Sequence, residues 1–294
     1  MNIQQSIHKN NQTVMRYMVI MTIVIGVLGH LISSYFHFGL TGTGCFLLLA
    51  GLINFFAYFF SDTLVVKSSG AKPITREMIP DYFERVESMV QQAQIPMPKL
   101  YFIDEAAMNA FASGRNANKA VVVVTRGLLE KLTLDEVTSV VAHELAHIQF
   151  NDMRLMAVVS VLAGLISILA DLFWYSNLVN AAQDKDRSGM LTFVGLALAL
   201  FAPICMLFVK LAISREREFA ADAQSAAITG KPLWLVSALE KIKRDQIPLP
   251  HVNAATAHLY ISNPNKNCWI DTLFSTHPDI NERIERLNQI ASTL

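Results

Sequence analysis

The chain has 294 residues, of which 52% are hydrophobic and 16% charged, and its mean hydropathy is +0.35. This composition is too apolar for an ordinary soluble enzyme of this length, so part of the chain is expected to lie in lipid. The 24 basic and 24 acidic residues cancel, and the sequence has no basic tract or glycine-rich phosphate loop that would indicate a nucleic-acid partner. The three cysteines show no paired spacing, which argues against a disulfide framework.

The first apolar run extends from Tyr17 to Ser61 and contains no Asp, Glu, Lys or Arg. A glycine-rich turn signal at 38–44 divides the run, which therefore predicts two membrane-spanning helices over about residues 17–37 and 43–61. A cleavable signal peptide is the competing interpretation, but the run is too long and no small-residue cleavage pattern leads into a soluble domain. We therefore expect residues 1–65 to form a permanent membrane hairpin.

Residues 66–153 are expected to form the first part of a soluble domain. Apolar residues at helical spacing predict an amphipathic helix that begins near Pro80. Three short strands are predicted next, over residues 100–103, 110–113 and 120–125. An edge of this small sheet could bind an extended peptide as an added strand, although a purely structural sheet explains the pattern equally well.

The most informative stretch is His143-Glu144-Leu145-Ala146-His147. Thr133 and Glu136 have the spacing of a capping box, and the apolar residues after them recur at helical spacing, so the stretch is predicted to lie on a helix. Two imidazoles four residues apart share one helical face and can bind a single zinc ion. Glu144 then lies where it can act as a general base. The alternative is a helix whose histidines bond to the backbone or to solvent.

Two further apolar segments, over about residues 155–175 and 190–210, predict a second membrane hairpin within residues 154–212. Asp171 must then lie near an interface, face the helix bundle or line a polar cavity. A pair of buried core helices is the alternative. Lysines and arginines lie on one side of all four predicted spans, so the termini and residues 66–153 are expected in the cytoplasm.

The last part of the domain, residues 213–294, offers a third metal ligand. Glu218 and Asp222 are predicted to share a helical face, so Glu218 can complete a zinc site while Asp222 orients a ligand histidine. Alternation of charge over residues 215–218 is also typical of a solvated helix. Glu216 is a second candidate ligand, but it has no acidic residue four positions later.

Two more helices are predicted in this last part. One covers residues 232–243, and the other has Pro278 at its first position. His277 stands directly before that helix. A histidine at this place can be a helix cap or a surface group as readily as a functional residue.

Four motifs stand out in the chain: His-Glu-Leu-Ala-His at 143–147, Ser-Arg-Glu-Arg-Glu-Phe-Ala-Ala-Asp at 214–222, Asn-Ala-Phe-Ala-Ser-Gly at 109–114, and Thr-His-Pro-Asp-Ile-Asn-Glu-Arg-Ile at 276–284. On these motifs the chain resembles the HtpX-like membrane zinc metalloproteases, relatives of the CAAX prenyl endopeptidases, and the resemblance extends over nearly its whole length. It implies a mainly α fold with a small β-sheet, an α+β zincin-type peptidase domain, and about four transmembrane helices.

The resemblance also implies roles for individual residues. His143, His147 and Glu218 would hold one zinc ion, Glu144 would be the catalytic base, and Asp222 would support a ligand. His277 and Arg283 would contact the substrate or the developing oxyanion. The substrate-binding edge strand would consist of Asn109, Ala110, Phe111 and Ala112. Ser113, where many relatives have Thr, is a small departure.

The function implied is hydrolysis of misfolded or damaged membrane proteins at cytoplasmic loops, as part of a stress response in the bacterial inner membrane. The expected partners are polypeptide substrates and the lipid bilayer, and the sequence carries no signal for an oligomeric state. A CAAX-type enzyme that cuts once near a lipidated terminus is one alternative. The other is a non-catalytic adaptor with structural zinc, although closed structural sites usually have four Cys or His ligands.

Overall fold

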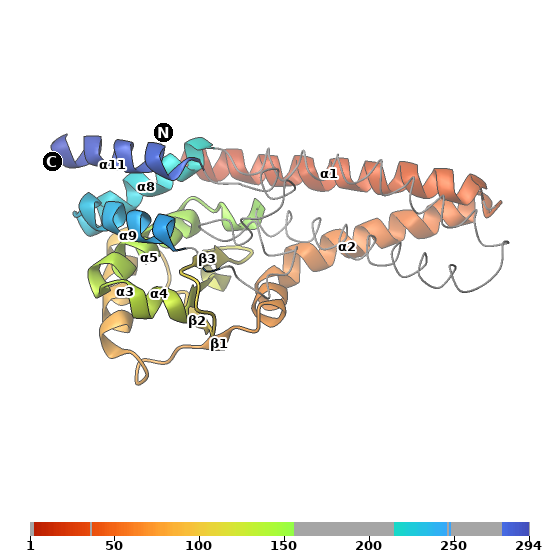
Figure 1. The fold of residues 1–294 in the computed structure, drawn as a ribbon. Helices are drawn as coiled ribbons and strands as arrows, with labels where there is room; N and C mark the ends of the chain where they lie inside the picture. Colours follow the sequence, from red (N-terminus) through yellow and green to blue (C-terminus); the bar gives the residue numbers. More distant parts are fainter. Residues whose placement is uncertain (1–2, 36, 156–214, 246, 248–277, 294) are drawn as a thin grey trace.

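The computed structural model describes residues 3–35, 37–155, 215–245, 247 and 278–293 (Figure 1). The described part is mainly helical, with one small mixed sheet, as predicted. The predicted second membrane hairpin, including Asp171, and the candidate residue His277 lie outside the described residues.

The two N-terminal helices form a long antiparallel hairpin that extends away from the other described helices and strands (Figure 1). Helix α1 spans Ile3–Tyr35 and helix α2 spans Gly39–Ser68. The chain reverses at His37 and Gly39, which have positive φ angles of 58° and 62°. The turn is therefore shorter than the expected 38–44, and the glycines that follow Gly39 belong to α2.

The hairpin combines a close internal contact with an apolar outer surface. A Cβ atom added to Gly29 of α1 would lie 2.2 Å from Cβ of Phe46 on α2, so the glycine allows close approach. Outward-facing side chains such as Leu40 and Leu48 are 82% and 72% exposed. Both helices are long and apolar enough to cross a membrane, and these two are the candidate spans found among the described residues.

The sheet has four strands in the order β1-β2-β4-β3. Strand β2 pairs with β4 in parallel, whereas β1 pairs with β2 and β3 with β4 in antiparallel fashion. The strands span Lys72–Pro73 (β1), Lys99–Ile103 (β2), Ala110–Ser113 (β3) and Val121–Thr125 (β4). The three predicted strands are confirmed to within one residue. The sequence did not predict β1, because two residues are too few to show an alternating pattern.

Helices pack around the sheet and make up most of the described chain outside the α1–α2 hairpin (Figure 1). They are α3 (Pro80–Ala93), a 3-10 turn (Ala117–Lys119), α4 (Arg126–Lys131), α5 (Leu134–Gln149), α8 (Arg215–Thr229), α9 (Pro232–Arg244) and α11 (Ile280–Thr293). Helix α5 is central: thirteen of its side chains are buried, and it packs against α3, α8, α9 and β3. The stretch from His143 to His147 therefore lies on the most enclosed helix of the described part.

The start of α5 confirms the predicted capping box. The Thr133 hydroxyl accepts a hydrogen bond from the Glu136 backbone N–H at 3.3 Å, and the Glu136 carboxylate accepts one from the Thr133 N–H at 2.7 Å. Glu136 also binds Lys241 of α9 at 2.7 Å and accepts a hydrogen bond from Ser237 at 2.6 Å. The cap therefore fixes α9 against α5 as well as starting the helix.

The start of α11 differs from the prediction. The helix begins at Ile280, so Pro278 precedes it and is not its first residue. Asp279 takes the capping position, because its carboxylate accepts a hydrogen bond from the Asn281 N–H at 2.7 Å and its carbonyl accepts one from Arg283. The helix starts after Asp279 because the aspartate carboxylate accepts a hydrogen bond from an N–H group that has no partner within the first turn.

Candidate active site

Helices α5 and α8 bring the three predicted metal ligands together. His143 and His147 lie one turn apart on α5, and their Nε2 atoms are 3.2 Å apart. Glu218 of α8 faces both: its Oε2 atom lies 3.6 Å from His143 Nε2 and its Oε1 atom 3.5 Å from His147 Nε2. All three side chains are almost fully enclosed, with exposures of 0%, 9% and 1% in that order.

These separations match the requirements of a tetrahedral metal ion. At metal-to-ligand distances of about 2.1 Å, tetrahedral geometry places neighbouring ligand atoms roughly 3.4 Å apart. The three ligand atoms all lie within 4.8 Å of one another, and each comes from a residue type that zinc prefers. Three protein ligands leave one coordination position for water or substrate, as in catalytic sites.

His143 is oriented from behind by Asp222, which the sequence predicted for this role. Its Nδ1 atom lies 3.0 Å from Asp222 Oδ1. Because a carboxylate can only accept, the proton sits on Nδ1 and leaves Nε2 to face the cluster. Asp222 is in turn bound by Arg283 of α11, which donates from Nε at 2.9 Å and from Nη2 at 2.7 Å.

His147 has its own carboxylate partner, Asp152, which the sequence analysis missed. The Nδ1 atom of His147 lies 3.1 Å from Asp152 Oδ2. Asp152 can reach back because Asn151 adopts a positive φ of 62° and the Asp152 N–H bonds to the His147 carbonyl at 2.9 Å. Each ligand histidine is thus held by a buried carboxylate, an arrangement common in metal sites.

Electrostatics around the cluster favour charged side chains. Burial lowers the pKa of His143, but hydrogen bonds to Asp222 and Glu218 outweigh it and raise that pKa to about 9. The pKa of His147 is also raised: burial opposes the shift, and the hydrogen bond to Asp152 drives it. Burial alone would raise the pKa of Asp222, yet the charge of Arg283 and the hydrogen bond to His143 bring it down to about 2. A metal ion entering the site therefore competes with protons.

Glu144 follows His143 directly on α5 and is 4% exposed. Burial, and next the charge of Glu144, raise the pKa of the Tyr82 phenol on α3, so Tyr82 stays protonated near the carboxylate. A glutamate beside the first ligand histidine is the residue that can move a proton to and from a reacting group at the cluster.

The remaining predicted site residues have different positions. The four side chains from Asn109 to Ala112 are buried, and β3, to which three of them belong, is the last strand in the sheet order and packs against α5. Arg283 is fully buried against Asp222, and its Nη1 atom lies 3.9 Å from Glu218 Oε2. Contact of these residues with substrate stays a prediction.

Comparison with known proteins agrees with this site. Residues 80–291 match Peptidase family M48. The chain is 39% identical over 290 residues to the protein named "Protease HtpX homolog" from Dictyoglomus thermophilum, covering 97% of this chain and 94% of that protein. A protein of the same name from Dictyoglomus turgidum is 41% identical over 263 residues, covering 88% and 85%.

Among solved structures, the crystal structure of S. mikatae Ste24p is similar at a TM-score of 0.47 and 18% identity, over 83% of this chain and 57% of that one. The family match takes in both ligand-bearing helices and α11, so it covers every residue of the His-His-Glu cluster and its Asp222 and Arg283 support. The chain belongs to Peptidase family M48 and is a metal-dependent peptidase, a hydrolase.

Proposed function

We propose that the protein is a zinc-dependent endopeptidase that cleaves polypeptides at the cytoplasmic surface of a bacterial inner membrane. The observation that carries the proposal is the cluster of His143, His147 and Glu218, with Glu144 beside it on the same buried helix. Two histidines and a glutamate form a known ligand set for peptide hydrolysis.

The chain's own residues then have defined tasks. Bound zinc supplies Lewis-acid chemistry that polarises a scissile carbonyl and lowers the pKa of water. Glu144 takes the proton from the attacking water and delivers it to the leaving amine. Asp222 and Asp152 hold the ligand histidines with Nε2 toward the cluster. Enclosure of the cluster strengthens each of these electrostatic interactions.

The membrane location is supported by the hairpin of α1 and α2, whose large apolar side chains face outward. Lys9 and Arg16 precede the apolar part of α1, and Lys67 lies in the last turn of α2, whereas the hairpin tip carries no charged residue. This distribution favours a cytoplasmic position for the peptidase domain. Asn10, near the start of α1, hydrogen-bonds to Phe150 and Asp152 just after α5, so the candidate site lies near the open end of the hairpin, which supports a position at the membrane surface.

We further propose that the substrates are misfolded or damaged membrane proteins, cut in loops that reach the cytoplasmic surface. The position of the candidate site beside the hairpin supports this choice, because loops of a membrane-protein substrate emerge from the bilayer at the height of the site. Cleavage of an unlipidated membrane protein at several positions distinguishes this activity from a single CAAX-type cut near a lipidated terminus.

The proposal is tested with detergent-purified, zinc-loaded protein and a model membrane-protein substrate. Wild type is compared with Glu144→Gln and with Glu240→Gln, a control at a half-exposed position on α9 that pairs only with Arg244 among the described residues. We expect Glu144→Gln to keep one zinc per chain and lose cleavage, while Glu240→Gln matches wild type. Equal cleavage by all three proteins, or no zinc in any, overturns the peptidase assignment in favour of an adaptor.

A further inference from the structure

A hydrogen bond connects the N-terminal membrane helix to the metal-ligand region. Asn10 of α1 is 4% exposed, and its Nδ2 atom donates to Asp152 Oδ1 at 2.5 Å and to the Phe150 carbonyl at 3.0 Å. Asp152 itself is 1% exposed. Its other oxygen, Oδ2, is the atom that faces His147. Asn10 is therefore linked to the candidate metal ligand His147 through a single side chain, that of Asp152. Asn10 and Asp152 are 142 positions apart in the sequence.

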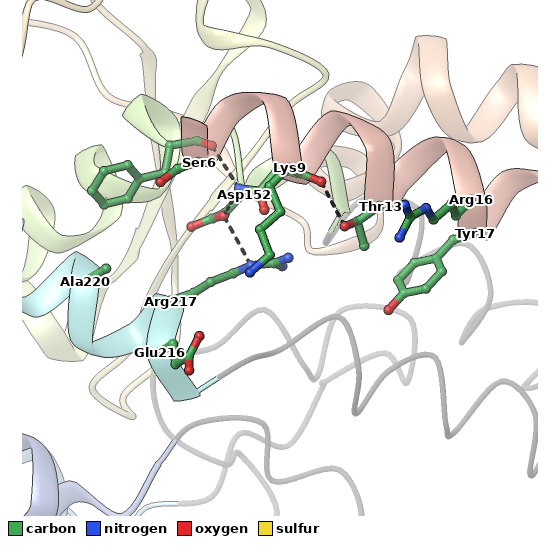
Figure 2. Close-up of a pocket in the computed structure, with 11 residues that line it drawn as sticks. Ser6, Lys9, Thr13, Arg16, Tyr17, Asp152, Glu216, Arg217 and Ala220 are labelled. Carbon is green, nitrogen blue, oxygen red and sulfur yellow. Dashed lines mark hydrogen bonds and ion pairs between the residues drawn. The ribbon is translucent and has the colours of Figure 1, made fainter. Parts of the chain in front are cut away.

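Asp152 lies between α1 and α8. Figure 2 shows it beside the N-terminal turns of α1, with Arg217 on the opposite side. Arg217 Nε lies 3.7 Å from Asp152 Oδ1, longer than a hydrogen bond, so Asn10 makes the shorter of these two contacts with that oxygen. A cavity of about 450 Å³ adjoins the same place and is lined by Asn10, Asp152 and Arg217 among others.

The neighbouring residue of α1 contacts the same turn of the chain. The Asn11 side-chain oxygen accepts hydrogen bonds from Asn151 Nδ2 at 3.1 Å and from Arg154 Nη1 at 2.9 Å. Asn151 is the residue whose positive φ directs Asp152 back toward His147. Helix α1 thus contacts both the carboxylate and the backbone reversal that presents it.

A buried carboxylate that orients a ligand histidine must itself be fixed. Removing a donor from a buried acceptor leaves it unsatisfied, and the side chain then turns toward other donors. The amide of Asn10 is neutral, so it restrains Asp152 without cancelling the charge that His147 needs from it. An aspartate at position 10 would instead place a second negative charge against Asp152.

We propose that Asn10 is a positioning residue of the metal centre: it holds Asp152 in the orientation that directs His147 Nε2 toward the ion. The membrane helix α1 is then part of the metal site, and a displacement of α1 relative to the peptidase domain weakens metal binding. The inference rests on the proposed function, since it concerns a ligand of the metal.

The experiment measures zinc affinity of the full-length protein in detergent by competition with a chromophoric chelator, and records the absorption spectrum of the cobalt-substituted protein. Asn10→Leu removes the donor and keeps the branch at the γ carbon, with two methyl groups in place of the amide. Gln12→Leu is the matched control, because Gln12 is exposed on the same helix and bonds only to His8 among the described residues. Asp152→Asn reports the effect of removing the carboxylate itself.

We expect Asn10→Leu to bind zinc on the order of tenfold more weakly and to alter the cobalt spectrum, with Asp152→Asn affected at least as strongly. Gln12→Leu should match wild type. In the double variant, Asn10→Leu should add little to Asp152→Asn, because both act through the same contact. If Asn10→Leu does not fold, Asn10→Ser replaces it, with weaker zinc binding again expected.

Wild-type zinc affinity and an unchanged cobalt spectrum in the folded Asn10 variant would falsify the inference while leaving the peptidase assignment intact. Failure of the proposed function has a different signature, in which wild type binds no zinc or Glu144→Gln still cleaves. If wild type binds no zinc, the inference about Asn10 is overturned as well. If Glu144→Gln still cleaves, the zinc measurements on the Asn10 variants still decide the inference.

Discussion

Arg283 donates two hydrogen bonds to Asp222, from Nε to Oδ2 at 2.9 Å and from Nη2 to Oδ1 at 2.7 Å. Both side chains are buried, and Asp222 is also the partner of the ligand His143. Helix α11 is thereby joined to the cluster of His143, His147 and Glu218 through Asp222 of α8. Burial lowers the pKa of Arg283, but the charge of Asp222 outweighs it and raises that pKa, so the guanidinium remains charged.

Replacing Arg283 by Met should destabilise the protein strongly. The substitution leaves the Asp222 carboxylate buried without its charged partner, which costs on the order of 3–5 kcal/mol in comparable buried pairs. We expect a large fall in the thermal unfolding midpoint in detergent. Arg286→Met is the control, since Arg286 lies on the same helix but is half-exposed, with its guanidinium over the Phe219 ring at 3.5 Å.

The predicted contact of Arg283 with substrate can be tested separately from this structural role. Arg283→Lys keeps the positive charge but cannot donate two parallel hydrogen bonds. If the variant retains zinc and folds, yet loses kcat with little change in KM, Arg283 also acts on the reacting groups. An unfolding midpoint for Arg283→Met equal to that of Arg286→Met contradicts the buried pairing.

Two acids of α8, Glu218 and Glu216, should behave differently. Glu218 is 1% exposed and faces both histidines, whereas Glu216 is exposed and lines the cavity beside α1. We expect Glu218→Ala to lose stoichiometric zinc and all cleavage, and Glu216→Ala to retain both. Metal content after gel filtration decides the matter. Loss of zinc in Glu216→Ala alone would show that the alternative ligand is the real one.

Zinc affinity should rise with pH. Despite burial, hydrogen bonds to Asp222 and Glu218 raise the pKa of His143 to about 9 in the metal-free protein, and the hydrogen bond to Asp152 raises that of His147, so at neutral pH zinc must displace protons. The apparent affinity is then expected to increase about tenfold per pH unit for each proton displaced, levelling off above pH 9. Chelator competition between pH 6 and pH 9 in roughly half-unit steps tests this, and an affinity independent of pH over that interval excludes proton displacement.

Glu136 should make stability depend on pH in the acid range. Burial raises the pKa of Glu136, but hydrogen bonds from Lys241 and Ser237 outweigh it, so the folded pKa lies below the ordinary value of 4.5. A lowered folded pKa means that the stabilisation is complete above pH 4.5 and is lost as the pH falls through the folded pKa. Glu136→Gln should reduce stability by about 1–2 kcal/mol at neutral pH.

The same substitution should flatten the acid limb of the stability curve, because the glutamine cannot titrate. Unfolding midpoints between about pH 3 and 7 provide the measurement. Glu130→Gln serves as the control, since Glu130 forms an exposed ion pair with Arg126 that is expected to contribute little. An acid limb of equal slope in Glu136→Gln and wild type is the outcome that rejects this explanation.

The local part of the site could be predicted from the sequence because it depends on near neighbours. The capping signal of Thr133 and Glu136 and the i and i+4 spacing of the two histidines lie within a few residues of chain. Strands β2 to β4 are short apolar runs separated by turn-prone or acidic residues. The pairing of Glu218 with those histidines also followed from helical spacing together with the ligand chemistry of zinc.

Apart from Asp222, which the sequence predicted, tertiary structure alone decided which buried groups support those candidate ligands. Asn10 meets Asp152 across 142 positions and Arg283 meets Asp222 across 61, and a hydrogen-bond partner at such distance leaves no periodic pattern in the chain. The return of Asp152 to His147 depends on one left-handed residue, Asn151, that no motif marks. The sequence by itself determined the candidate ligands and the helices that carry them. Packing of α1, α8 and α11 around α5 determined how those side chains are held, because a buried charge is satisfied by whichever donors the fold brings to it.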